Sequence, residues 1–244
     1  MFTRRQEGVL ARTHEGEPGL PRGKNRLPPA EVRAAQRARL LGAVVASVAA
    51  AGYSEVTVAD IVRAARVSRA AFYAHFTDKE DCFIAACREG GQLMIDGITA
   101  AKRSLPAGSS SPEQVLRVSL VAFLDFLVRE PVFARAFYID RPAAGPRAAR
   151  LLRAANHSFA GFNRAWHERA RLDRPDWPAV PDEAYYALAG ATAELVRAKV
   201  SQNLTDTVTG LEDTLVALHL AVLAGQAWQR SGEPSELQAS SSGA

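Results

Sequence analysis

The chain has few of the residues that stabilise secreted proteins or bind metals. Among its 244 residues there are two cysteines, Cys82 and Cys87. They lie five positions apart on one predicted helix, a spacing that points their side chains in different directions and does not suit a disulfide. The sequence contains no CxxC pair and no Cys/His cluster with metal-ligand spacing. We therefore expect packed, free thiols, no metal site and no cofactor.

Long apolar segments are also missing. The longest charge-free apolar runs, 40–53 and 215–228, are 14 residues each, whereas a membrane-spanning helix needs ~20. The N-terminal segment has arginines but no apolar stretch of the kind found in a secretory signal. These absences predict a cytoplasmic protein without a membrane segment.

Motifs that would indicate catalysis are absent as well. No Glu or Asp stands three residues before any of the five histidines, which excludes the E-x-x-H pattern of helical di-iron sites. The sequence has no HExxH, phosphate-binding loop, GxSxG or GxGxxG motif. We predict that the chain is not an enzyme.

The content that is present is that of a globular protein with an uneven charge. Hydrophobic residues make up 48% and charged residues 23% of the chain, values typical of a folded domain. Residues 1–80 carry 13 basic and 8 acidic side chains, and the remainder carries 17 and 18. The excess of positive charge in the first third indicates a surface that faces a polyanion. A basic N-terminal tail is the alternative explanation.

Helix signals run through the chain, and no alternating pattern predicts a strand. Capping residues, N1 prolines and apolar periodicity predict an all-α fold of about nine helices. The expected N-terminal caps are Thr57 with Asp60, Ser68, Thr77 with Glu80, Ser111 with Gln114 and Thr209 with Glu212. The expected helices cover 29–51, 58–65, 68–75, 77 to the break at 104–111, 111–129, a short helix from 131, 146–172, 182–199 and a last helix from the T-x-x-E box at 209–212. Residues 1–33 and 231–244 are expected to be flexible.

The short helices within 57–76 carry the most information. A helix, a turn of about three residues and a second helix capped by Ser68 are what a helix-turn-helix requires, with the second helix in the DNA major groove. Ile61 and Phe72 would pack on the helix 29–51, which leaves Arg69 and Tyr73 facing outward. An arginine there can pair with guanine. Spacing alone also fits an ordinary helical hairpin with core aromatics.

The amino-acid sequence of this segment is more specific than its spacing. Residues 52–83, GYSEVTVADIVRAARVSRAAFYAHFTDKEDCF, closely resemble the DNA-binding region of the tetracycline-repressor (TetR) family, and the resemblance covers about residues 34–94. It is carried by a set of features in matching register: Gly52, Thr57-Val58-Ala59, Ile61, Ala65, Val67-Ser68, Phe72-Tyr73, His75-Phe76 and Lys79-Glu80.

The resemblance implies a homodimer that reads a palindromic operator on double-stranded DNA, usually as a repressor. The positions implied to contact DNA are, for phosphates, Thr57, Tyr73, His75 and Lys79, and for base edges, Ala59, Arg69 and Ala70, with Ser68 at the start of the recognition helix. Arg66 stands where the family usually has glycine, and a non-glycine residue in the left-handed conformation costs ~1 to 2 kcal/mol. Either the turn is reshaped, or Arg66 accepts this strain and adds charge near the DNA backbone. Ala71 replaces a frequent threonine. The N-terminal arm is expected to be a loose tail or a minor-groove reader.

The same resemblance implies an effector-binding and dimerisation domain over residues 95–230. A helix rich in small residues, 182–199, precedes a leucine seam at Leu211, Leu215, Leu218 and Val222. These two helices could pair with their symmetry mates as a four-helix dimer interface. The seam could equally be buried within one protomer.

Aromatic residues of the C-terminal half could line a pocket for a small, mostly apolar effector. The candidates are Phe123, Phe126, Tyr138, His157, Phe162, Trp166 and Tyr186, although aromatics at helical spacing also form plain cores. Two other functions remain open. The chain could be an all-helical enzyme or carrier that lacks specific DNA binding, or a regulator controlled by a partner protein. A C-terminal domain without a cavity of ~300 Å³ would favour the partner protein.

Overall fold

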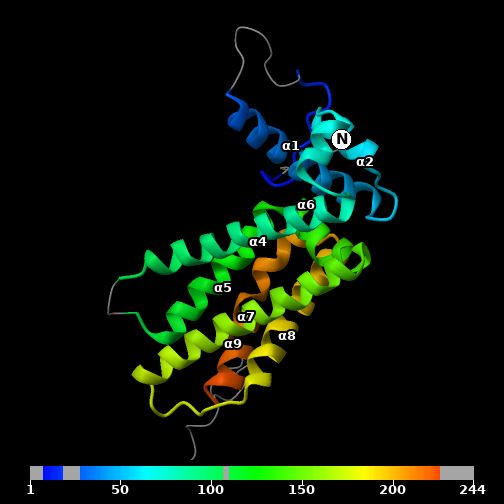
Figure 1. Ribbon diagram of the computed structural model, residues 1–244. Coiled ribbons are helices and arrows are strands. Elements are labelled where there is room, and N and C mark those ends of the chain that lie inside the picture. The colour runs from blue at the N-terminus through cyan, green and yellow to red at the C-terminus, as the bar shows by residue number, and fades with distance from the viewer. Residues whose placement is uncertain (1–7, 19–27, 107–109, 226–244) are drawn as a thin grey trace, which may run out of the picture.

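The structure, a computed structural model, describes residues 8–18, 28–106 and 110–225. Within these ranges it contains nine α-helices and no strand, which confirms the all-α prediction. A small unit of α1–α3 packs at one end of a longer bundle of α4–α9 (Figure 1). In chain order the helices are α1 Pro29–Ala51, α2 Val58–Ala65, α3 Arg69–His75, α4 Lys79–Arg103, α5 Pro112–Arg129, α6 Pro131–Arg135, α7 Pro146–Asp173, α8 Asp182–Ser201 and α9 Glu212–Leu223.

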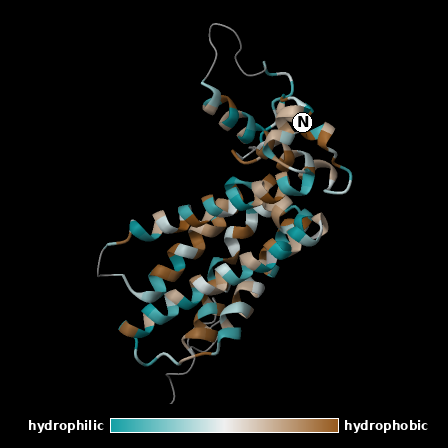
Figure 2. Ribbon diagram, in the orientation of Figure 1, coloured by the Kyte–Doolittle hydropathy of each residue, from teal (hydrophilic) through white to brown (hydrophobic). Residues whose placement is uncertain are grey.

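The small unit forms because α1, α2 and α3 each bury one apolar side. Leu40 and Val44 of α1, Ile61 of α2 and Phe72 of α3 have no solvent exposure, as the apolar spacing predicted. Hydrophobic and hydrophilic segments alternate along these helices (Figure 2). The start of α4 contributes Phe83, also fully buried, so this helix belongs to both parts of the molecule.

The helix caps largely follow the sequence. Thr57 with Asp60 and Ser111 with Gln114 form complete capping boxes at α2 and α5, and Ser68 caps α3 by accepting a bond from the Ala71 amide at 3.1 Å. Such caps satisfy amides that lack a partner in the first helical turn.

Two predicted caps are wrong. Asp78, not Thr77, caps α4 and accepts from the Asp81 amide at 2.8 Å. Glu80, which was expected to complete the box, turns instead toward α7. Thr209 lies inside a 3-10 helix, η4 Thr205–Leu211, so the N-cap of α9 is Leu211, two residues after the Thr209 that the T-x-x-E pattern indicates.

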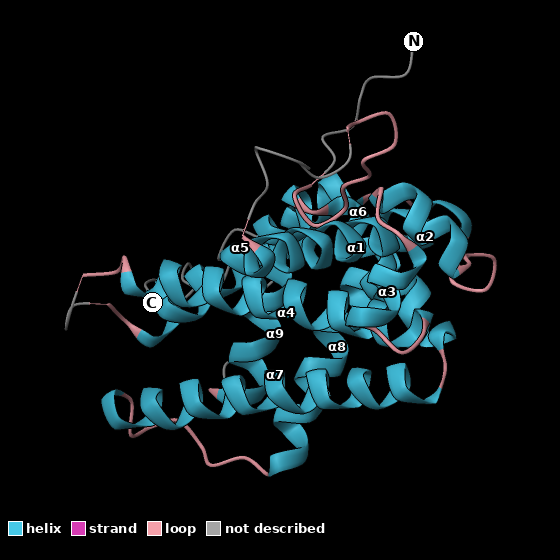
Figure 3. Cartoon of the chain, turned by 45° about the horizontal axis from the view of Figure 1, so that its top comes forward, coloured by secondary structure: helices cyan, strands magenta, loops and turns pink. Residues whose placement is uncertain are grey.

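The C-terminal bundle arranges α5, α7, α8 and α9 around an interior to which α4 also contributes (Figure 3). Between α6 and α7 the chain passes through a π-helical turn, η2 Ala136–Asp140, and a 3-10 turn, η3 Arg141–Ala144. Among the helices that the structure describes, none is both long and apolar enough to cross a bilayer.

The first part of the N-terminal arm is packed, which corrects the expectation of a loose arm over residues 1–33. Ala11 is buried and the His14 amide donates to the Ala64 carbonyl of α2 at 2.7 Å. The carboxylate of Glu130 accepts from the Val9 and Leu10 amides at 2.9 and 3.0 Å. Residues 29–33 belong to α1. Residues 1–7 and 19–27, like the expected tail 231–244, lie outside the described residues.

The leucine seam is divided between the protein interior and the surface. Leu211 and Leu215 are buried within the protomer, and Val222 is 38% exposed. Part of the seam therefore packs inside one chain, and only its C-terminal end is available to a partner.

Candidate functional site

The α2–turn–α3 unit presents most of the predicted DNA contacts at its surface. Six of the eight side chains are exposed: Thr57, Ala59, Ser68, Arg69, Ala70 and Tyr73. The Arg69 guanidinium lies over the Tyr73 ring, 5.7 Å from its centroid. The Thr57 hydroxyl donates to Asp60 at 2.6 Å within the capping box. The exposed set therefore includes a guanidinium and a phenol that can reach a nucleic acid.

The turn of this unit keeps its left-handed geometry in spite of Arg66. This residue has φ 54° and ψ 42°, and its amide bonds to carbonyls of α2. Of the two alternatives, a reshaped turn or a strained Arg66, the structure shows the second, and the left-handed conformation costs ~1 to 2 kcal/mol for a residue with a Cβ. The turn is thus conserved in shape, and the Arg66 side chain is exposed beside it.

The other two predicted phosphate ligands are only partly accessible. Lys79 donates from Nζ to the carbonyls of Tyr53 and Val56, both at 2.7 Å, and lies over the Tyr53 ring. Two of its three N–H bonds therefore hold the loop before α2. His75 is half-buried, and burial together with Arg37 and Arg33 lowers its pKa, so its ring is neutral near pH 7.

The second candidate site is a cavity of about 530 Å³ inside the C-terminal bundle. This volume lies in the range of ligand pockets and above the ~300 Å³ that an effector site requires. Residues from α4, α5, α7 and α8 line it, together with η2, η3 and α9. Four of the seven predicted pocket residues are among them: Phe123, Tyr138, Phe162 and Trp166.

The structure places the other three predicted pocket residues outside the cavity. Phe126 is buried, but it packs edge-on against Phe133 of α6, at a centroid distance of 6.0 Å. His157 and Tyr186 contact each other at 4.9 Å on the outer side of α7 and α8, where Tyr186 is 39% exposed. Which side chains of α5 and α7 face the cavity depends on the orientation of each helix about its own axis. Residue spacing alone does not determine this orientation.

Sequence reasoning missed the charged lining of the cavity. Four cations and one carboxylate line it: Lys102, Arg141, Arg169, Arg197 and Glu194. Glu194 pairs with Arg197 at 2.7 Å. Arg141 is 2% exposed, and the π-helical turn that precedes it directs Phe137, Tyr138 and Arg141 to the same cavity. A π-turn has no simple sequence signature, but such turns are frequent at functional sites.

His219 of α9 also lines the cavity. It is buried, and burial lowers its pKa. Its Nδ1–H donates to the Leu215 carbonyl at 2.7 Å, so Nε2 is the unprotonated nitrogen of the neutral ring. This side chain adds a hydrogen-bond acceptor to a mostly apolar lining.

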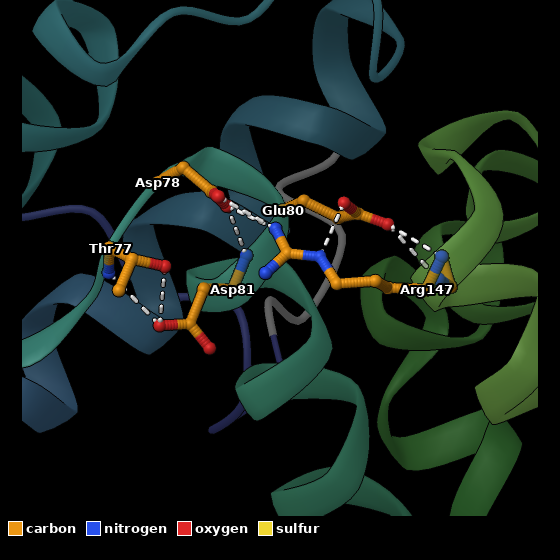
Figure 4. A network of polar contacts seen from close by, with 6 residues as sticks. Thr77, Asp78, Glu80, Asp81 and Arg147 are labelled. Carbon is orange, nitrogen blue, oxygen red and sulfur yellow. Dashed lines mark hydrogen bonds and ion pairs between the residues drawn. The ribbon is translucent and has the colours of Figure 1, made fainter.

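A polar network joins the small unit to the cavity helices (Figure 4). Arg147 of α7 donates to Asp78 at 2.6 and 2.7 Å and to Glu80 at 2.7 Å. Glu80 also accepts the amides of Arg147 and Ala148, at 3.0 and 3.2 Å. Burial raises the pKa of Asp78, but the hydrogen bond from the Asp81 amide and the Arg147 guanidinium outweigh it and lower the pKa overall. The start of α4, just after α3, is therefore fixed to the start of α7.

Comparison with solved structures finds the same fold in several bacterial regulators. The fatty acid degradation regulator FadR from Bacillus halodurans has a TM-score of 0.66 and 18% identity over 78% of this chain and 98% of that chain. FadR from Bacillus subtilis has a TM-score of 0.66 and 14% identity over 75% and 97%. A TetR-like transcriptional regulator from Rhodococcus sp. RHA1 has a TM-score of 0.60 and 23% identity over 82% and 100%.

The helix-turn-helix segment also matches a family model. Residues 40–86 match the model described as bacterial regulatory proteins of the tetR family. A comparison with curated proteins found no match. These residues span α2, α3 and the parts of α1 and α4 that enclose them, which is the unit on which the sequence resemblance rests. The chain therefore contains a segment that matches the DNA-binding region of the tetR family of bacterial regulatory proteins, and it shares the fold of solved TetR-like regulators.

Proposed function

We propose that this protein is a homodimeric repressor in the cytoplasm, without enzymatic activity, that leaves a palindromic operator when a small, mostly apolar effector occupies the cavity. The observation that carries the proposal is the position of α4. Its first residues follow α3 directly, and Ile95, Ile98 and Thr99 near its other end line the cavity. A ligand that moves the far end of α4 would change the placement of the recognition helix.

The second connection between the two sites supports the same mechanism. Helix α7 lines the cavity through residues such as Phe159 and Trp166, and its N-terminus is bonded to Asp78 and Glu80. A change in the separation of α4 and α7 around a ligand would thus reach α3 by two routes. Effector binding then favours a dimer in which the two recognition helices are no longer one DNA turn, ~34 to 36 Å, apart.

The lining and one relative support an apolar effector. The cavity walls are largely aliphatic and aromatic, with Phe123, Phe137 and Phe159 among them. The structure of FadR from Bacillus subtilis, which shares the fold, is that of a complex with stearoyl-CoA. A fold that accommodates a long acyl chain in one protein is compatible with a long apolar ligand in this one. The volume also argues against control by a partner protein alone.

The homodimer is supported by apolar surface on the last two helices. Tyr186 of α8 and Val222 of α9 are 39% and 38% exposed, and Ala187 beside Tyr186 is exposed. We propose that α8 and the C-terminal end of α9 pair with the same helices of a second copy, which would bury these side chains.

Selection of bound duplexes from a random pool, at two salt concentrations, tests the proposal. An enriched palindrome whose binding weakens steeply with salt is expected. Arg69→Ala should relax the preference at one base pair by ~1 to 3 kcal/mol. Arg63→Ala is the matched control, because Arg63 is exposed on α2 but paired with Asp60 at 2.8 Å.

The outcomes separate specific binding from a scaffold without that function. No enrichment by folded, dimeric protein would refute the proposal. An enriched palindrome that Arg69→Ala leaves unchanged would keep the function and refute the assigned role of Arg69.

A further inference from the structure

We propose that the cavity binds an amphipathic organic anion, with its charged group on Arg141 and its apolar body along the aromatic walls. The inference rests on the proposed function, and it names the chemical class of the ligand. It depends on the surroundings of one buried guanidinium.

Arg141 is a buried cation that has no counter-ion among the residues that the structure describes. The side chain is 2% exposed, and its Nε and Nη1 atoms are buried with no hydrogen-bond partner among the described residues. Arginine stays protonated at neutral pH even in apolar surroundings, although burial lowers the pKa of Arg141. A buried charge is normally paired, because removal from water is costly. The missing partner is what a ligand anion would supply.

The contact that Arg141 does make leaves its donors available. Its Cζ atom lies 3.5 Å from the centroid of the Phe137 ring. A guanidinium stacked on an aromatic face keeps its N–H bonds in its own plane. These donors can form a bidentate pair with a carboxylate or a phosphate. Phe137 and Arg141 both line the cavity, so the charged group of a ligand on Arg141 would lie within it.

Asp140, the neighbouring acid, does not fill this role. It is also buried, its Oδ2 atom has no hydrogen-bond partner among the described residues, and burial raises its pKa. Only Glu194 supplies a carboxylate to the described lining, and Arg197 already pairs with it. The remaining cations, Lys102 and Arg169, add to the positive potential of the cavity. The charges therefore favour an anion over a neutral or cationic ligand.

Two fluorescent probes that differ only in the anionic group test the inference. They are 1-anilinonaphthalene-8-sulfonate and its neutral analogue N-phenyl-1-naphthylamine. The full-length protein should bind the sulfonate at least about tenfold more tightly, because a hydrogen bond to a charged group contributes that much. Arg141→Met, which keeps the apolar length of the side chain, should remove this preference and leave binding of the neutral probe within about twofold.

Arg197→Met is the matched control. It removes a cation from the same lining, but one that Glu194 already neutralises, so the preference for the sulfonate should persist. Competition then defines the anion. Dodecanoate should displace the sulfonate from the wild-type protein and dodecan-1-ol should not, and dodecyl phosphate shows whether a phosphate serves as well as a carboxylate.

The results that would overturn the inference differ from those that would overturn the proposed function. Equal binding of the two probes, or a preference that survives Arg141→Met in a variant with wild-type circular dichroism, refutes the anion site. Binding of neither probe to the folded protein refutes the cavity as a ligand site. Dodecanoate could bind through Arg141 while the protein stays bound to the enriched palindrome. This result would support the anion site and refute its proposed role in release from DNA.

Discussion

Glu80→Ala should destabilise the protein more than the loss of an ordinary surface carboxylate. Glu80 accepts the Arg147 and Ala148 amides and the Arg147 Nε–H. The amides belong to the first turn of α7, whose N-cap residue Gly145 has no side chain to bond them. Glu80 thus caps α7 from a distant helix. Its side chain is only 18% exposed.

The expected loss is about 2 kcal/mol of unfolding free energy. Removal of a capping side chain costs about 1 kcal/mol, and a partly buried, hydrogen-bonded ion pair adds about 1 kcal/mol. Arg147 keeps its bonds to Asp78, which limits the cost. Glu80→Gln should recover part of it, because the amide oxygen can still accept the two backbone bonds.

Urea unfolding followed by tryptophan fluorescence measures this change, at one protein concentration because a dimer gains stability with concentration. Glu89→Ala is the matched control. Glu89 is also on α4 and pairs with Arg37 at 2.8 Å, but both side chains are more than 40% exposed. That pair should contribute at most about 0.5 kcal/mol. If Glu80→Ala lowers the midpoint no more than Glu89→Ala at equal slope, the assignment of Glu80 as the cap of α7 is wrong.

Three further predictions concern stability, all measured by urea unfolding. Arg66→Gly should stabilise the protein by about 0.5 to 1 kcal/mol, since relief of left-handed strain exceeds the added freedom of the unfolded chain; a loss would show that the Arg66 side chain contributes more than the strain costs. Gly90→Ala should destabilise by about 1 to 3 kcal/mol, because its Cβ would meet Phe133 at 2.2 Å, whereas Gly91→Ala, with nothing within 4 Å, should not. The unfolding free energy should decrease as the pH is lowered below about 6.5, because His219 binds a proton in the unfolded chain and the buried ring resists it. His219→Asn should reduce the dependence of the unfolding free energy on pH by up to about 1.4 kcal/mol per pH unit. An unchanged pH dependence would contradict a lowered pKa of His219.

The sequence predicts those parts of the molecule that local interactions determine. The caps at Thr57, Ser68 and Ser111 depend on residues three positions away, and the predicted starts of their helices agree with the structure. The register of the resemblance identified Arg66 as the position where the turn is either strained or reshaped, and the structure shows the strained, left-handed form. Local signals compete where acids are adjacent, and Asp78 takes the cap position that Thr77 was expected to hold.

Features that depend on packing between distant segments were not predictable. Phe123 and Phe126 are three residues apart on α5, yet only Phe123 reaches the cavity. The folded part of the arm is held by backbone amides bonded to Glu130 and to the Ala64 carbonyl, and an amide carries no sequence information. The arm crosses α1 at Gly42, where a Cβ would lie 3.0 Å from the Arg12 carbonyl oxygen.

Three connections join the small unit to the bundle, and any movement of the recognition helix α3 must act on them. Helix α4 is continuous from Lys79 to the cavity, and Arg147 fixes its start to α7. The arm adds a third connection, from Glu130 at the α5–α6 junction to α2. The arm holds α2, whereas α3 is followed directly by α4. A shift of α4 would therefore move α3 first. The helices α2 and α3 would rotate together as one body only if the arm moved with them. In the proposed mechanism, the strength of the arm contacts would therefore set how far effector binding displaces Arg69 from the base edges.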